Sequence, residues 1–176
     1  RILRNKKIDF KKINFFLVDE RFVDDKTNQS NFFNIYNVFF NHIDSRFFKI
    51  YYENKSVVEL ASNYENLITT TIKHNKKGPF FDLILLGMGN DGHTASLFPD
   101  SNGLNEKNKL VISNYIQEIK KYRITMTYPL LLNSLNTIIL INDLNKNILL
   151  NNLTQSHPIK KIIDNSIKLK ILCSNT

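Results

Sequence analysis

One short stretch of this 176-residue sequence, Asp91-Gly92-His93, places a carboxylate and an imidazole on either side of a glycine. A carboxylate near an imidazole can fix the tautomer of the ring and stabilise its protonated form, which makes the imidazole a good general base near pH 7. The same residues also allow a structural interpretation, in which Asp91 caps a short helix starting at Thr94 and His93 is an ordinary loop histidine. Spacing alone leaves both interpretations open.

The glycines around this pair indicate what kind of ligand approaches it. Gly87, Gly89 and Gly92 formally match the G-x-G-x-x-G pattern of dinucleotide-binding folds. That pattern needs a long helix after the third glycine and an acidic residue about 20 positions further on. Pro99 stops any such helix soon after it begins. The stretch therefore favours a glycine-rich turn whose backbone approaches a small ligand over a dinucleotide site.

Two of the arginines lie next to strand-like runs. Arg21 follows the apolar run that begins at Ile13, and Arg123 lies within the run before Thr127. An arginine fork binds phosphate through two N–H groups at once, which a lysine cannot do. Without further context, however, the sequence favours a surface ion pair of Arg21 with Asp19 or Asp24.

Several other kinds of chemistry are disfavoured. The four histidines are far apart and form no metal-binding pattern: His42, His74, His93 and His157. No G-x-S-x-G nucleophile motif is present, and Ser96 is interpreted as a helix residue. The single cysteine, Cys173, cannot form an intramolecular disulfide and is expected to pack in the interior, which favours a reducing compartment such as the cytoplasm.

The net charge of +8 does not indicate nucleic-acid binding, because it is evenly spread. Residues 1–88 carry 14 basic and 10 acidic side chains, and residues 89–176 carry 10 and 6, so each half has a net charge of +4. A small anionic substrate fits this charge equally well. No apolar run approaches the roughly 18 residues that cross a bilayer, and no signal peptide is visible near Arg1. We therefore expect neither a nucleic acid nor a membrane as a partner.

Strand-like and helical segments alternate along the chain. Apolar runs predict strands at 13–18, 47–52, 81–86, 109–115, 122–126, 137–141 and 168–173. Helical spacing follows Ser30, and a capping box at Ser56 and Glu59 opens a helix that ends at 76–79. Residues 127–132 predict a short helix, and 99–108 a loop.

The run 81–86 is nearly continuous in apolar residues, as in strands buried on both faces. The alternation predicts one α/β domain over residues 1–176, with a mostly parallel, Rossmann-like sheet and helices on both faces in a three-layer αβα sandwich. Residues 1–11 are expected to be frayed. Open sheets of this kind bind ligands at the carboxyl ends of their strands, where the glycine-rich turn falls.

Taken together, three stretches resemble the 6-phosphogluconolactonase family, which belongs to a larger group that includes the glucosamine-6-phosphate isomerase/deaminases. They are Phe-Leu-Val-Asp-Glu-Arg at 16–21, the long stretch 81–99 that contains Asp91-Gly92-His93, and Arg-Ile-Thr-Met-Thr-Tyr-Pro at 123–129. The second stretch is long and highly specific. The deaminases usually have Asn-Glu-Pro where this chain has Leu97-Phe98-Pro99, and the phenylalanine cannot replace the glutamate that assists ring opening.

The resemblance implies hydrolysis of 6-phospho-D-glucono-1,5-lactone to 6-phosphogluconate, in the oxidative pentose phosphate pathway. His93 would be the general base, with Asp91 beside it, and Arg21 and Arg123 would hold the 6-phosphate. Backbone N–H groups of the Gly89–Gly92 turn would hold the developing oxyanion. The remaining substrate-binding positions that the resemblance implies are Asp19, Gly89, Asn90, Gly92 and Lys121. No metal or cofactor is expected, because a lactone is already activated for attack.

One departure from the family concerns its N-terminal part. Family members normally begin with a further strand and a glycine-rich loop that cradles the phosphate, and nothing before Asp19 resembles that loop. We therefore expect an N-terminally truncated unit with an open sheet edge beside the strand ending at Asp19. Lactonase units are fused to glucose-6-phosphate dehydrogenase in some lineages, so fusion or association with that enzyme is one expectation. The alternatives are a glucosamine-6-phosphate isomerase/deaminase-like enzyme and a non-catalytic sugar-phosphate-binding module.

Overall fold

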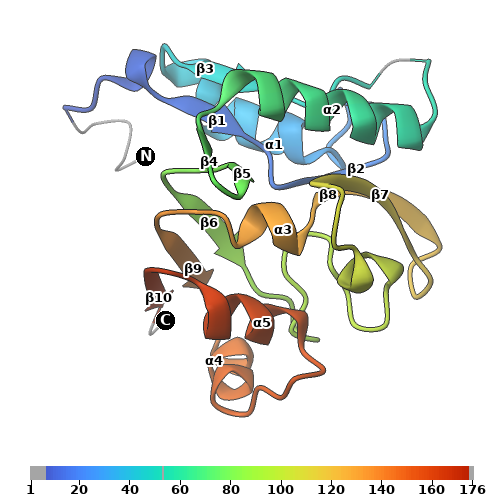
Figure 1. The fold of residues 1–176 in the computed structure, drawn as a ribbon, viewed down its shortest axis with the longest axis vertical. Coiled ribbons are helices and arrows are strands. Elements are labelled where there is room, and N and C mark those ends of the chain that lie inside the picture. Colours follow the sequence, from blue (N-terminus) through green and yellow to red (C-terminus); the bar gives the residue numbers. More distant parts are fainter. Residues whose placement is uncertain (1–6, 53, 175–176) are drawn as a thin grey trace.

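The computed structural model describes residues 7–52 and 54–174. Strands β1 and β3 and helices α1 and α2 form one part of the molecule, and strands β6, β9 and β10 with helices α3 to α5 form another (Figure 1). The hairpin of β7 and β8 lies beside them. Of the N-terminal residues expected to be frayed, 1–6 lie outside the described residues, whereas Phe10–Lys12 form a 3-10 turn in which Phe10 is buried.

Two sheets are parallel and two are antiparallel. In the parallel sheets, β1 (Asn14–Phe16) pairs with β3 (Arg46–Phe48), and β9 (Thr137–Ile141) pairs with both β10 (Leu169–Cys173) and β6 (Ile84–Gly87). The antiparallel pairs join β8 (Lys121–Met126) to β2 (Asp19–Arg21) and β7 (Val111–Ile116), and β4 (His74–Asn75) to β5 (Gly78–Pro79). The predicted α/β class is confirmed, but β7 and β8 form a hairpin, so the sheet is only partly parallel.

Most predicted elements are present. The helices are α1 (Asn31–Val38), α2 (Val57–Thr71), α3 (Tyr128–Leu131), α4 (Leu144–Asn151) and α5 (Pro158–Asn165), with 3-10 turns at Phe40–His42 and Asn102–Asn105. Ser30 caps α1 by accepting a hydrogen bond from Phe33 N at 3.1 Å, and the predicted capping box of Ser56 and Glu59 opens α2. Helix α2 ends before 76–79, because the β4–β5 hairpin follows it.

Among the described residues, one large hydrophobic core joins helices α2, α3 and α5 to the sheets. Its fully buried members include Ile68, Leu97, Ile124, Met126, Leu130, Leu131, Ile139, Ile159 and Ile162. One polar contact also crosses it: the Tyr64 hydroxyl donates to Leu17 O at 3.0 Å and accepts from Leu17 N at 2.8 Å. Burial raises the pKa of Tyr64, so the hydroxyl stays protonated and holds the end of β1 against α2.

The parallel sheet of β6, β9 and β10 is buried on one face only. Ile84 and Leu86 of β6 are buried, whereas Leu85 between them is 52% exposed. Leu140 of β9 and Leu172 of β10, which lie on the same face as Leu85, are 48% and 49% exposed. The expectation that the strand at 81–86 is buried on both faces is therefore wrong for the described residues, because α3 and α5 pack on the opposite face and no other described segment covers this one.

In the described residues, both strands of the β1–β3 sheet are edges, and the β6–β9–β10 sheet has free edges at β6 and β10. Among the described strands, β1 pairs only with β3 and β6 only with β9. No helix in the described part of the chain is long and apolar enough to cross a membrane.

Candidate active site

The carboxylate of Asp91 binds the imidazole of His93 directly. Asp91 Oδ1 lies 2.6 Å from His93 Nδ1 and accepts the backbone N–H of His93 at 3.1 Å. No helix follows, since Thr94 and Leu97 form a bridge with a tight turn between them. The interpretation of Asp91 as a helix cap is therefore wrong. Because Nδ1 faces a carboxylate, it carries the ring proton, and Nε2 is left as the basic nitrogen.

The loop around His93 is built to hold the ring closely. A Cβ atom at Gly89 would lie 2.1 Å from His93 Nδ1 and 2.3 Å from Cε1, so only glycine fits there. Gly92 has a φ of +75°, and a Cβ on it would lie 2.7 Å from the side chain of His157. Ile159 N, at the start of α5, donates to Gly92 O at 3.0 Å. The two glycines thus let the loop pack between the imidazole and helix α5.

Arg21 and Arg123 form a pair across the antiparallel strands β2 and β8. The two residues are direct partners in the register, so their side chains lie on the same face. Arg123 Nε is buried and has no hydrogen-bond partner among the described residues. Burial, and then the charge of Arg21, lower the pKa of the Arg123 guanidinium. Like charges directly opposite each other destabilise a sheet, so this pair is suited to an anion that binds both.

Arg21 does not make the expected surface ion pair. Its Nη1 donates to Gln29 O at 2.6 Å, and it forms no ion pair with Asp19 or Asp24 in the described part of the chain. The remaining N–H groups of the fork are free to bind a ligand. That interpretation of Arg21 as half of a surface ion pair is therefore wrong.

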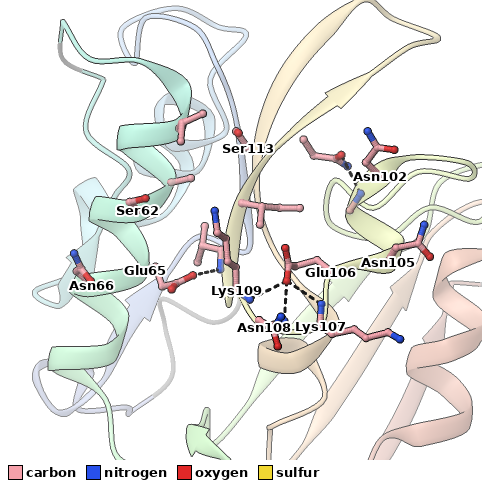
Figure 2. Close-up of a pocket in the computed structure, with 16 residues that line it drawn as sticks. Ser62, Glu65, Asn66, Asn102, Asn105, Glu106, Lys107, Asn108, Lys109 and Ser113 are labelled. Carbon is pink, nitrogen blue, oxygen red and sulfur yellow. Dashed lines mark hydrogen bonds between the residues drawn. The ribbon is translucent and has the colours of Figure 1, made fainter.

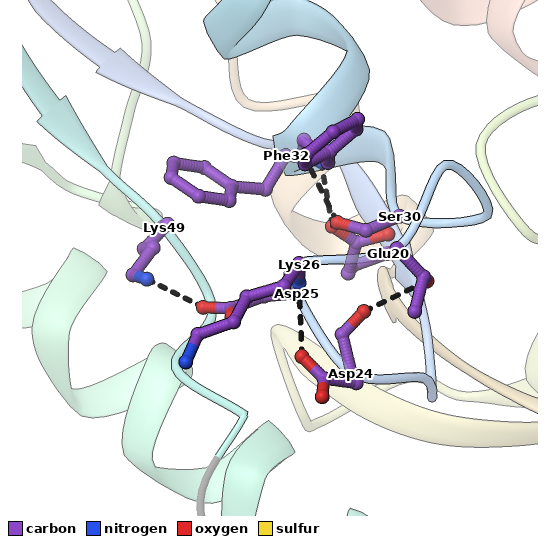
Figure 3. A network of polar contacts seen from close by, with 9 residues as sticks. Glu20, Asp24, Asp25, Lys26, Ser30, Phe32 and Lys49 are labelled. Carbon is purple, nitrogen blue, oxygen red and sulfur yellow. Dashed lines mark hydrogen bonds and ion pairs between the residues drawn. The ribbon is translucent and has the colours of Figure 1, made fainter.

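A buried carboxylate, Glu20, anchors the segment that carries Arg21 (Figure 3). Glu20 is 4% exposed and accepts hydrogen bonds from the backbone N–H groups of Arg21, Asn31 and Phe32, each at 2.7 Å. It also accepts the hydroxyl of Ser30 at 2.9 Å. The N-terminus of α1 adds a favourable dipole for this negative charge. Glu20 lies in the stretch 16–21 that resembles the family, but the sequence assigned it no role of its own.

The loop that follows β2 is held by an ion pair between Asp25 and Lys49. Lys49 Nζ lies 2.5 Å from Asp25 Oδ2, and it also lies over the rings of Phe32 and Tyr51, at 4.4 and 4.9 Å from their centroids (Figure 3). Both charged side chains are largely buried. The contacts tie this loop to the segment that follows β3 and to helix α1.

Ser96 links the arginine pair to the His93 loop. Its hydroxyl donates to Asp19 Oδ2 at 2.6 Å, and its N–H donates to Thr125 Oγ1 at 3.1 Å. Asp19 and Thr125 pair in the same register as the two arginines, two positions away, and so lie on the same face. That face therefore points toward the loop of His93. Ser96 itself is 1% exposed and lies in a turn, so its interpretation as a helix residue is wrong.

The backbone amides of residues 89–92 differ in whether they are already hydrogen-bonded within the loop. Gly89 N donates to His93 O at 2.8 Å and Gly92 N donates to Gly89 O at 3.1 Å, so these two amides are already used within the loop. The amides of Asn90 and Asp91 have no hydrogen-bond partner in the described segments. An oxyanion in this loop would therefore bind the second pair of amides and not the first.

The side chains of Lys121 and Cys173 make no contact with the His93 loop or the arginine pair in the described structure. Lys121 is exposed at the start of β8, on the same face as Arg123 and two positions before it, and no contact joins it to the site residues. Cys173 is exposed in β10, so the expectation that it packs in the interior is wrong. Within the described residues, no three His, Cys, Asp or Glu side chains come together as a metal site would require.

A groove of about 740 Å³ lies elsewhere, between α2 and residues 102–109 (Figure 2). Its two carboxylates are occupied by backbone groups: Glu65 accepts from Leu110 and Val111 N–H, and Glu106 accepts from three successive N–H groups. None of the expected site residues lines it. The groove is therefore separate from the dyad and the arginine pair.

The structure thus joins an imidazole–carboxylate dyad and a facing pair of arginines on one α/β fold. Residues 1–169 match the model of the glucosamine-6-phosphate isomerases/6-phosphogluconolactonase family. The chain belongs to this family.

Two similar proteins are named 6-phosphogluconolactonase. The chain is 35% identical over 130 residues to the 6-phosphogluconolactonase of Chlamydia pneumoniae, which covers 73% of this chain and 48% of the relative. It is 34% identical over 135 residues to the 6-phosphogluconolactonase of Thermotoga maritima, which covers 76% of this chain and 58% of the relative. The chain thus spans about half the length of the curated relatives it matches.

Solved structures support the fold. A 6-phosphogluconolactonase from Shewanella baltica superposes with a TM-score of 0.87 at 22% identity, over 98% of this chain and 76% of that one. The Thermotoga maritima 6-phosphogluconolactonase superposes with a TM-score of 0.82 at 28% identity, over 98% of this chain and 77% of that one. The fold described above is therefore that of the family.

Proposed function

We propose that this chain is the catalytic unit of a 6-phosphogluconolactonase, which hydrolyses 6-phospho-D-glucono-1,5-lactone to 6-phosphogluconate. The observation that carries the proposal is the facing pair of Arg21 and Arg123, with a buried Arg123 Nε that lacks a partner in the described structure. Two facing cations favour a bound anion, and the face that carries them points toward the loop that contains His93. The names of the relatives support the same substrate.

The proposed reaction begins at Nε2 of His93. Because Asp91 holds Nδ1, Nε2 accepts a proton from a water molecule, and the water oxygen forms a bond to C1 of the lactone. The carbonyl oxygen becomes an oxyanion. The amides of Asn90 and Asp91 are the donors proposed to stabilise it, since those of Gly89 and Gly92 are already used.

The second step opens the ring. The bond from C1 to the ring oxygen breaks, and the protonated His93 returns its proton to that oxygen, which leaves as a hydroxyl group. The product is the open-chain acid, and the imidazole is neutral again. A lactone is an activated ester, so the proposed reaction needs no metal or cofactor.

The arginines act on the other end of the substrate. Two charge-assisted forks hold the 6-phosphate and place C1 near the imidazole, so that part of the binding energy serves to orient the reacting atoms. Asp19 lies beside them, but its carboxylate accepts from Ser96, so its proposed role is to hold the two halves of the site together. Lys121 is proposed to attract the anionic substrate from the exposed start of β8.

Phe98 supports the lactonase over the related amino-sugar deaminase. Its ring stacks on the imidazole of His93, with centroids 4.0 Å apart, at the position where the deaminases carry a glutamate. An apolar ring cannot transfer the proton that opens an amino sugar. The deaminase reaction is therefore the second candidate, and a non-catalytic sugar-phosphate-binding module is the third.

One assay compares these three functions. The chain is mixed with freshly prepared 6-phosphogluconolactone and acid release is followed, and the same chain with glucosamine 6-phosphate is assayed for ammonia. Acid release above the spontaneous rate, lost in His93→Ala, supports the proposal. Ammonia release without lactone hydrolysis, or binding of 6-phosphogluconate with no turnover, would replace it by the second or third candidate.

We also propose that the domain is completed by a further strand-bearing segment beside β6. The free edge of β6 and the exposed face around Leu85 and Leu140 support this, because parallel sheets are normally covered on both faces. A glycine-rich loop on such a segment would add backbone N–H donors to the phosphate site.

The single, exposed Cys173 supports a reducing compartment such as the cytoplasm. Association with glucose-6-phosphate dehydrogenase, which would supply the lactone, remains a prediction.

A further inference from the structure

The imidazole of His93 is held by more than its hydrogen bond to Asp91. One face of the ring stacks on Phe98, with centroids 4.0 Å apart and the planes 17° from parallel. The Nδ1–Cε1 side lies against Gly89, where even a Cβ atom would not fit. Asp91 Oδ1 occupies the Nδ1 position at 2.6 Å. Among the described contacts, only Nε2 is left without a partner.

A hydrogen bond at Nδ1 fixes one atom of the ring but not its plane. The second side-chain torsion of histidine is soft, so a ring held only at Nδ1 can tilt and carry Nε2 away from its target. A flat aromatic ring stacked on one face removes this freedom, because tilting would break the contact between the two planes. Proton transfer depends on such alignment, since small displacements of a general base cost much of its effect.

Phe98 is itself held in place by its neighbours. Leu97, before it, is fully buried, and its N–H donates to Thr94 O at 2.9 Å. Phe98 O accepts the N–H of Ser101 at 3.1 Å. Pro99 follows and restricts the backbone further. The ring therefore presents a fixed surface to His93.

We infer that Phe98 is a positioning residue for His93: its ring sets the plane of the imidazole and thereby aims Nε2 at the reacting water. The inference deepens the proposed function and rests on it for the reaction, but the placement of the ring can be tested without activity. In the proposed reaction Phe98 contacts the imidazole and not the substrate, so its removal should change turnover and leave substrate binding nearly unchanged.

The test compares two substitutions of Phe98 with a matched change elsewhere. Phe98→Leu keeps apolar bulk without a flat ring, and Phe98→Tyr keeps the ring. Tyr115→Leu is the control, since Tyr115 also packs against an aromatic ring, that of Tyr122, but far along the β7–β8 hairpin. We expect kcat to fall by about tenfold or more in Phe98→Leu with KM for the lactone within about twofold. Phe98→Tyr should keep kcat within about threefold, and Tyr115→Leu should change neither constant.

Proton NMR of the imidazole gives the second readout. Because the ring of Phe98 stacks on the imidazole, we expect its ring current to displace the Cδ2 and Cε1 proton resonances of His93, which are identified by their loss in His93→Ala. These resonances should move in Phe98→Leu, and they should stay near their original positions in Phe98→Tyr. A purely structural role would lower the melting temperature without changing kcat in the folded protein.

An unchanged kcat in folded Phe98→Leu, or His93 resonances that do not move, would overturn the inference. If Phe98→Leu does not fold, Phe98→Met is measured in its place. If the unaltered chain hydrolyses no lactone, the proposed function fails, and the NMR comparison alone decides whether the ring of Phe98 stacks on the imidazole.

Discussion

Arg21 and Arg123 lie directly opposite each other on strands β2 and β8, so two guanidinium groups share one face of an antiparallel pair. No carboxylate forms an ion pair with either of them in the described residues. Asp19 and Glu20 are nearby, but the first binds Ser96 and the second binds backbone N–H groups. Two cations are therefore held close together, and in the proposed function a bound anion would offset their repulsion.

The first prediction concerns what each arginine contributes to binding. Arg123→Ala and Arg21→Ala should each weaken binding of 6-phosphogluconate by about 10- to 150-fold, which corresponds to about 1.5–3 kcal/mol for a charged hydrogen bond. Isothermal titration calorimetry measures this. Arg46→Ala is the control, because Arg46 is exposed on β3. Each variant is also assayed for hydrolysis of phosphorylated and of unphosphorylated gluconolactone. Equal losses of activity toward the two lactones would mean that the arginines act structurally.

The second prediction concerns the imidazole. His93→Ala should lower kcat by about 10²- to 10⁴-fold, since a general base contributes that much. Binding of 6-phosphogluconate should be almost unchanged, because His93 acts on water and not on the phosphate. Asp91→Asn should have a milder effect, because it alters the hydrogen bond that orients the ring but leaves the base present. His74→Ala, at an exposed histidine, is the control. Near-normal turnover by His93→Ala would contradict the mechanism.

The third prediction uses two glycines of the same loop. Gly89→Ala should abolish most lactone hydrolysis, because its Cβ would lie 2.1 Å from His93 Nδ1 and 2.6 Å from Asp91 Oδ1, and the dyad must move. Gly87→Ala is a matched control two residues away, with no atom within 4 Å of the added Cβ. Steady-state kinetics and melting temperatures of both variants check this. Similar activity of the two variants would show that the dyad tolerates displacement.

The fourth prediction concerns the buried carboxylate of Glu20. Glu20→Gln replaces an oxygen by an NH2 group among donors, so at least one N–H of Arg21, Asn31 or Phe32 loses its acceptor. The free energy of unfolding should fall by about 1–3 kcal/mol, the usual cost of an unsatisfied buried group. Denaturant unfolding measures it, with the exposed Glu118→Gln as control. A loss no larger than that of the control would mean that the network contributes little to stability.

The sequence predicted the elements of this fold better than their surroundings. The caps at Ser30 and Ser56 were correct because they depend on residues within one turn of the helix. The burial of the strand at 81–86 was wrong, because exposure of Leu85 depends on whether a distant segment covers that face. Periodicity within one strand holds no information about such a neighbour.

The same distinction applies to the candidate site. The pairing of Asp91 with His93 was foreseeable because the two residues are neighbours in the chain. The facing of Arg21 and Arg123 depends on the register of two strands about a hundred positions apart, which no local pattern specifies. The contact of Phe98 with His93 depends on a tight turn at Ala95, whose φ of +51° is unusual for a residue with a side chain.

The last prediction concerns the uncovered face of the β6–β9–β10 sheet. Leu140 is 48% exposed there, whereas Ile139, the preceding residue of β9, is fully buried on the other face. Ile139→Ala should lower the free energy of unfolding by about 2–5 kcal/mol, as for other buried aliphatic residues. Leu140→Ala should change it by no more than about 0.5 kcal/mol, as for a surface position.

Exposed apolar sheet faces and free edges also promote association between chains. The 176-residue chain should therefore self-associate with rising concentration, and Leu140→Lys should reduce this without lowering the melting temperature. Analytical ultracentrifugation measures the association, and denaturant unfolding measures the stability of Ile139→Ala and Leu140→Ala. A monomeric chain in which Leu140→Ala is as destabilising as Ile139→Ala would show that this face is covered within the chain itself.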